Sequence, residues 1–300
     1  MTLPIAVVVT MMWWLLGASG TLVGSVIGML LCSLCAYLIL ELNNENALIR
    51  VRSRMMATVY VALMGAMSFL HTFQSGHIVM VCMLVTYHVL FRSYQRADST
   101  GWTFYGFAAI SLASLFCSYL LYLVPVYLLL MVLYLQSLSL RTLFAALLGV
   151  ILPYWLWAVY LFIEGRIDQF LRPLAMLLKL PAFDYSMVSV QQILSLAFVV
   201  LLSIISIAHF IATAFSDKIK VRMLYQFLIF NEVVLLAYVV LFPEQFNLLF
   251  MLFTVNSSTL ISHYFTLSHG RVSNIVFISA VVMLVCLAVF NVWSPSVSFS

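Results

Sequence analysis

The chain is 300 residues long, and 65% of its residues are hydrophobic while only 7% are charged. About a quarter of the residues of a soluble domain are charged, so this composition excludes a water-soluble globule. Thirteen Lys and Arg against nine Asp and Glu give a net charge of +4. In a chain with a mean hydropathy of +1.17, an excess of basic residues influences how the chain is oriented in a membrane. We therefore expect no nucleic-acid partner.

Apolar segments follow one another along the whole chain and predict an all-α, polytopic bundle of transmembrane helices in a single integral domain, residues 1–300. A helix needs about 20 residues to cross about 30 Å of hydrocarbon. The uncharged runs 3–40 and 102–139 are therefore each divided into two helices, whereas 78–91 is short for a crossing. The eleven predicted spans cover residues 3–17, 21–40, 56–73, 78–91, 102–118, 121–138, 142–163, 190–215, 223–242, 248–267 and 275–293.

The basic residues predict how these spans are oriented. Short cytoplasmic loops collect Lys and Arg, and short outer loops do not. An inside N-terminus places ten basic residues inside and three outside, so we expect an N-in, C-out topology. The inner set is Arg50, Arg52, Arg54, Arg92, Arg96, Arg141, Lys218, Lys220, Arg222 and Arg271. The outer set is Arg166, Arg172 and Lys179.

Glu232 is the only acidic residue within any predicted span, and it lies near the middle of the span 223–242, next to Asn231. A carboxyl group at membrane depth is costly, so it serves either as a hydrogen-bonding link between helices or as a functional acid. Both interpretations stay open from the sequence. The next span carries a polar stripe at helical spacing that can reach Glu232: Asn256, Thr259, His263 and Thr266.

The predicted outer loop, residues 164–189, is the second candidate site. Its basic residues Arg166, Arg172 and Lys179 have the chemistry to hold a lipid phosphate or pyrophosphate. Simple anchoring of the loop at the membrane surface is the alternative. The sequence has no metal-ligand spacing and no phosphate-binding or nucleophile loop, so we expect no metal and no cofactor, and the catalytic residues stay unknown.

The predicted inner loop, residues 41–55, reads ELNNENALIRVRSRM. Its arginines lie beside anionic headgroups in any conformation, and control of topology explains them. Its acidic and amide half, residues 41–46, predicts a cap or a side-chain lock of the loop.

Residues 42–157 contain three runs that carry a family resemblance: LNNENALIRVRSRM, SYQRAD and FAAISLASLFCSYLLYLVPVYLLLMVLYLQSLSLRTLFAALLGVILPYWLW. They resemble an uncharacterised family of multi-pass bacterial inner-membrane proteins, which implies a location in the cell envelope and no known activity. The region is also similar to the membrane core of GT-C-type glycosyltransferases, which use polyprenyl-phosphate sugars. Those enzymes carry a catalytic carboxylate in the first outer loop, where this chain has residues 17–20, Gly-Ala-Ser-Gly. No catalytic residue is therefore carried over.

Four functions are compatible with these patterns. The leading hypothesis is a non-catalytic or accessory membrane protein of the bacterial inner membrane that binds membrane lipids, including a polyprenyl-phosphate glycolipid. The alternatives are a GT-C-like sugar transferase, a secondary transporter with a site at Glu232, and a structural subunit that packs against other membrane subunits. A Glu232 held in a tight helix contact with both oxygens hydrogen-bonded would weaken the transporter hypothesis.

Overall fold

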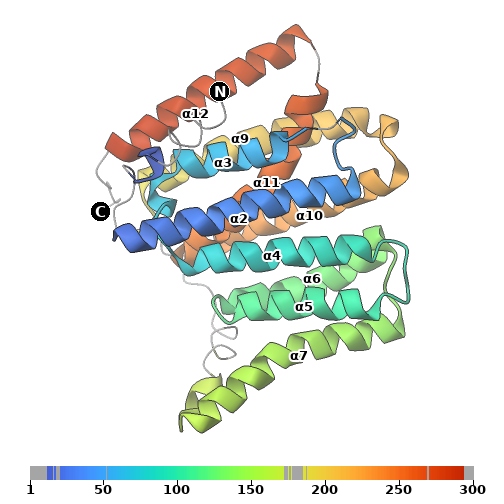
Figure 1. Cartoon of the computed structure of the whole chain (residues 1–300). Helices are drawn as coiled ribbons and strands as arrows, with labels where there is room; N and C mark the ends of the chain where they lie inside the picture. Colours follow the sequence, from blue (N-terminus) through green and yellow to red (C-terminus); the bar gives the residue numbers. More distant parts are fainter. Residues whose placement is uncertain are drawn as a thin grey trace. The chain divides into compact units, whose positions relative to one another are not determined.

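The computed structural model shows an all-α protein (Figure 1) and describes residues 12–15, 17, 21–51, 53–171, 175, 177, 185, 186, 188–268 and 270–293. Its α-helices are α2 (Leu22–Asn46), α3 (Met55–Ala66), α4 (Ser75–Arg92), α5 (Thr100–Ser114), α6 (Leu123–Leu130), α7 (Leu140–Ile163), α9 (Val190–Thr213), α10 (Ile219–Leu241), α11 (Phe246–Leu267) and α12 (Arg271–Trp293). Short helical turns adjoin them: η1 (Ser68–Leu70), η2 (Ser118–Tyr122), η3 (Met131–Leu135), η4 (Ile167–Leu171), η5 (Ala214–Ser216) and η6 (Pro243–Gln245).

Eight described segments are long and apolar enough to cross a membrane, which confirms a multi-pass helical membrane protein. They are Leu22–Asn46, Ser75–Arg92, Ser118–Leu135, Leu140–Ile163, Val190–Ser216, Ile219–Leu241, Pro243–Leu267 and Arg271–Trp293. The predicted span 78–91, which is short for a crossing, lies in a helix of 18 residues. Most of the predicted span 3–17 lies outside the described residues, and the N-in, C-out orientation stays a prediction.

Two predicted spans are shorter helices in the structure. In place of 56–73, α3 has 12 residues and ends at Ala66. Its last carbonyls accept side-chain donors: Trp13 Nε1 donates to Gly65 O at 2.9 Å, and Asn291 Nδ2 donates to Ala66 O at 2.9 Å. These bonds satisfy the helix end and let the chain turn into η1. In place of 102–118, α5 has 15 residues.

The loop predicted at residues 41–55 is shorter than expected, because α2 continues through its acidic and amide half to Asn46. Ala47 then adopts a left-handed conformation with φ 49°. Asn43 fixes the turn that follows: its Oδ1 accepts a hydrogen bond from Ile49 N at 3.0 Å, and its Nδ2 donates to Ser53 O at 3.4 Å. The expected side-chain lock of this loop is thereby confirmed for Asn43.

Two of the long helices, α7 and α9, begin with a capping box. Before α7, Ser139 N donates to Thr142 Oγ1 at 2.7 Å and Thr142 N donates back to Ser139 Oγ at 3.3 Å. Before α9, Ser189 and Gln192 form the same reciprocal pair, at 2.7 and 3.3 Å. Each box satisfies backbone N–H groups that have no carbonyl partner within the helix.

The chain divides into two compact units, and the prediction of one integral domain stays a prediction. The first unit comprises residues 1–77, 183–218 and 228–300, and α11 is buried along nearly its whole length there. The second unit comprises residues 78–182 and 219–227. In it α5 packs closely on α7 at Gly149, where an added Cβ would lie 2.5 Å from Phe104 O.

Candidate functional site

The carboxyl group of Glu232 is buried in the first unit and hydrogen-bonded through both oxygens. Glu232 as a whole residue is only 3% exposed. Oε1 lies 2.8 Å from Ser203 Oγ and 2.5 Å from Ser257 Oγ. Oε2 accepts a hydrogen bond from Asn256 Nδ2 at 2.6 Å. We call Ser203, Glu232, Asn256 and Ser257 the Glu232 cluster.

Three helices build the Glu232 cluster. Ser203 belongs to α9, Glu232 to α10, and the neighbours Asn256 and Ser257 to α11. Asn256 also donates through Nδ2 to Leu228 O at 2.9 Å and accepts at Oδ1 from Asn231 Nδ2 at 3.3 Å. The cluster therefore links three helices through hydrogen bonds between buried groups. Polar side chains that bond across neighbouring helices in membranes are arranged in this way.

A second buried carboxylate, Asp217, lies in the turn between α9 and α10. Arg50 Nε lies 2.6 Å from its Oδ1, and His263 Nε2 lies 3.4 Å from its Oδ2. Arg50 is 41% exposed and also donates to Ser216 Oγ at 2.7 Å, whereas the side chains of Asp217 and His263 are buried. The ring of His209 lies 6.4 Å from the ring of His263. We call Arg50, Asp217 and His263 the Asp217 cluster.

The structure separates the residues of the predicted polar stripe. It brings Asn256 and Asn231 to Glu232, but it places His263 at Asp217. His263 follows Ser257 by six residues, about 9 Å along α11. Thr259 donates to the Asn256 carbonyl at 2.6 Å, and the buried hydroxyl of Thr266 has no hydrogen-bond partner among the described residues.

The predicted outer phosphate site is described only at Arg166. This residue is exposed just after α7, and its backbone N–H donates to Leu161 O at 2.9 Å. Arg172 and Lys179 lie outside the described residues. The predicted grouping of these three side chains therefore stays a prediction.

Sequence reasoning missed three residues that the structure places in the two clusters: Ser203, Ser257 and Asp217. Ser203 is one of several serines of α9, and Ser257 lies in the polar run 256–259, so nothing in the sequence sets either hydroxyl apart from serines that bond to their own helix. Asp217 lies outside the predicted spans, where a carboxylate needs no buried partner. From the sequence, Arg50 was interpreted only as a residue that controls topology.

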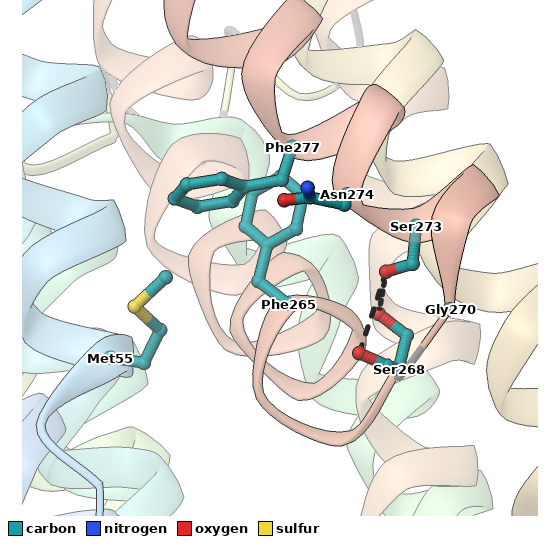
Figure 2. A pocket seen from close by; sticks show the side chains of 7 residues that line it. All are labelled: Met55, Phe265, Ser268, Gly270, Ser273, Asn274 and Phe277. Atoms are coloured by element: carbon teal, nitrogen blue, oxygen red, sulfur yellow. Dashed lines mark hydrogen bonds between the residues drawn. The ribbon is translucent and has the colours of Figure 1, made fainter.

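A pocket of about 350 Å³ lies between α3, α11 and α12 in the first unit. Figure 2 shows the rings of Phe265 and Phe277 next to each other, with Met55 facing them from α3. The two ring centroids are 5.1 Å apart and the rings are perpendicular. Ser268, Gly270, Ser273 and Asn274 complete the lining. We call this site the α12 pocket.

The polar side of the α12 pocket is formed where α11 passes into α12. The hydroxyl groups of Ser268 and Ser273 are hydrogen-bonded to each other. Asn274 is exposed, and its amide forms no hydrogen bond to a described residue (Figure 2). Phe277 is 37% exposed. The α12 pocket is therefore amphipathic and open to its surroundings.

Among the described residues, no three His, Cys, Asp or Glu side chains gather where they could hold a metal ion. The candidate sites in the described part of the chain are the Glu232 cluster, the Asp217 cluster and the α12 pocket. The two family resemblances stay predictions. No protein-family model, no curated protein and no solved structure matches this chain.

Proposed function

We propose that this multi-pass protein is a non-catalytic component of the bacterial inner membrane that binds a lipid with a phosphate-bearing head in the α12 pocket. The observation that carries the proposal is the amphipathic lining of this pocket, with aromatic rings beside hydroxyl and amide groups. Small-molecule sites combine apolar surface with a few placed polar groups and begin at about 300 Å³, and the α12 pocket has both kinds of surface at about that size.

The lining matches the part of a lipid where the head joins the chain. Phe265 and Phe277 offer flat apolar surface to the first methylene groups. The amide of Asn274 and the hydroxyl of Ser273 lie at the same end of the pocket for ester or phosphate oxygens (Figure 2). A volume of about 350 Å³ holds this junction and not a whole lipid, so the rest of the chain extends into the bilayer.

The charges beside the α12 pocket favour an anionic head. Arg54 immediately precedes the lining residue Met55, and Arg271 immediately follows the lining residue Gly270. Both arginines are exposed. A guanidinium group binds phosphate oxygens with two parallel hydrogen bonds. A polyprenyl-linked glycolipid belongs to this class of lipid, and so does an anionic phospholipid.

The transporter alternative loses support from the geometry of Glu232. A midplane transport site needs a carboxylate that faces a cavity, whereas both oxygens of Glu232 are hydrogen-bonded and the residue is buried. The Glu232 cluster instead fits an interhelical link.

Lipid exchange followed by native mass spectrometry tests the proposal. The purified chain is depleted of lipid and offered undecaprenyl phosphate, phosphatidylglycerol or phosphatidylcholine. We expect retention of the two anionic lipids above phosphatidylcholine, and loss of that retention in Arg54→Gln/Arg271→Gln and in Asn274→Leu. Preference for undecaprenyl phosphate over phosphatidylglycerol would support a polyprenyl-linked lipid as the ligand, and the reverse would support a bulk anionic phospholipid.

Two single variants control for general loss of basic charge. Arg141→Gln removes an exposed arginine at the start of α7, outside the pocket lining, and we expect unchanged lipid retention. Arg166→Gln tests the predicted outer site. Loss of retention in Arg166→Gln with normal retention in the pocket variants would contradict the α12 pocket and move the site to the outer loop.

A further inference from the structure

The hydrogen atoms of the Glu232 cluster can be assigned by counting donors. A serine hydroxyl has one hydrogen to donate and lone pairs to accept. Ser257 Oγ lies 2.5 Å from Glu232 Oε1 and also 2.8 Å from Phe253 O. A carbonyl oxygen has no hydrogen, so the single hydrogen of Ser257 serves only one of these contacts while Glu232 is ionised.

A protonated Glu232 satisfies every contact. Ser257 then donates to Phe253 O, and the carboxyl hydrogen on Oε1 of Glu232 bonds to Ser257 Oγ. Oε1 still accepts from Ser203 at 2.8 Å, since a carboxylic hydroxyl both donates and accepts. The two hydrogens of Asn256 Nδ2 go to Glu232 Oε2 and Leu228 O. Each hydrogen is used once.

The charges around Glu232 agree with this assignment. The groups that face it are neutral: Ser203 from α9, and Asn256 and Ser257 from α11. On α10 itself its neighbour is Asn231, which bonds to Asn256. Among the described residues, Arg50 forms an ion pair with Asp217, His263 lies beside Asp217, and Glu232 takes part in neither contact. An ionised carboxylate at this depth without a counter-charge costs several kcal/mol.

We propose that Glu232 is a proton-binding site inside the membrane, filled by one proton while α9, α10 and α11 are packed together. The ligand is the proton itself and not a metal cation. A separation of these helices that admits water to Glu232 lets the carboxyl group release its proton to that water and become a solvated carboxylate. The site thereby links helix packing to proton uptake, independently of lipid binding in the α12 pocket.

Infrared spectroscopy of the whole protein in lipid bilayers tests the assignment. At neutral pH we expect a carbonyl band of a protonated carboxylic acid, of one group per chain, that Glu232→Gln abolishes. The matched control is Glu244→Gln, which removes an exposed carboxylate of η6 and leaves the band unchanged. Absence of the band from the wild-type protein would overturn the proposal.

Two further measurements keep the test decisive if Glu232→Gln folds poorly. Ser257→Ala retains Glu232 but removes the group that its hydrogen bonds to, so the carbonyl band should persist and shift. A band unmoved by Ser257→Ala would contradict the donor assignment. The second measurement is the apparent Tm in sodium, potassium or choline chloride at one pH and ionic strength, and we expect the same value in all three salts. A Tm that sodium raises in the wild-type protein but not in Glu232→Gln would identify a cation site instead.

Discussion

The Glu232 cluster and the Asp217 cluster show two ways of burying a carboxyl group in one helical unit. Both use α11, and both place the side chain out of contact with solvent. Asp217 has a counter-charge, because Arg50 reaches it at 2.6 Å from a partly exposed position. Glu232 is held by neutral hydroxyl and amide groups. Access to a solvated cation therefore decides whether a buried acid here remains charged.

The difference follows from the position of each acid along its helices. Asp217 lies between the candidate spans 190–216 and 219–241, where an arginine side chain can bridge to water. Glu232 lies in the middle of α10, beyond such reach. Individual interhelical hydrogen bonds in membranes are weak, on average about 0.6 kcal/mol and at most about 1.7 kcal/mol. The number of bonds and the cost of leaving a group unbonded therefore decide the stability of each cluster.

The largest effect is expected for Asn256→Leu. This change removes the donor to Glu232 Oε2 and the donor to Leu228 O. We expect a loss of about 3 kcal/mol, because these two bonds and the bond from Asn231 Nδ2 to Asn256 Oδ1 disappear, and a buried carboxyl oxygen is left unsatisfied. A thiol-reactive dye reports the unfolding in detergent, since Cys32, Cys35, Cys82 and Cys117 are buried, and a Cys286→Ser background removes the exposed thiol.

Asn274→Leu is the matched control for this prediction. It is the same substitution at an exposed amide of α12 that bonds to no described residue, and we expect little change in the apparent Tm. A similar fall in both variants would show that the loss comes from the leucine and not from the hydrogen bonds of the Glu232 cluster.

Asp217→Asn should have the next largest effect. The change removes the negative charge that Arg50 neutralises and that lies beside His263. Loss of one partner of a buried ion pair costs about 3–5 kcal/mol and an exposed pair contributes about 0–1 kcal/mol, so for this pair, with one partner buried and the other 41% exposed, we expect a loss of about 2 kcal/mol. In a double-mutant cycle, Arg50→Gln should cost little once Asp217 is already Asn. Additive losses would contradict the ion pair.

Ser203→Ala should have a smaller effect, about 0.6–1 kcal/mol. It removes one of the contacts of Glu232 Oε1 and leaves the contact with Ser257 in place. Ser206→Ala is the matched control on α9, because the Ser206 hydroxyl donates to Leu202 O in its own helix and its loss should change stability less. A larger effect of Ser206→Ala would mean that the α9 serines act through their own helix and not through Glu232.

The sequence predicted the fold class and much of the Glu232 cluster, but little of the Asp217 cluster. Hydropathy and length are properties of single segments, so eight of the predicted spans correspond to apolar helices of spanning length. Glu232 and Asn256 were predicted because polar groups are conspicuous inside apolar spans. Asp217 and Arg50 lie at the ends of spans, where charged residues are common. Their pairing depends on the fold, since 167 positions separate them in the sequence.

The smallest effect is expected for Glu232→Gln, and it gives the sharpest contrast between the clusters because it is the same acid-to-amide change as Asp217→Asn. If Glu232 is protonated, a glutamine can take over its contacts. The amide N–H₂ donates to Ser257 Oγ and to Ser203 Oγ, so Ser203 changes from donor to acceptor, and the amide carbonyl accepts from Asn256. We expect the free energy of unfolding, followed through the apparent Tm, to fall by less than about 0.5 kcal/mol, because each interhelical bond is replaced by a similar one. An ionised Glu232 predicts a larger loss, since the amide group would bring N–H donors toward hydroxyl groups that already donate to the carboxylate. Equal losses in the two variants would therefore show that both acids are charged, and that the neutral surroundings of Glu232 do not determine its state.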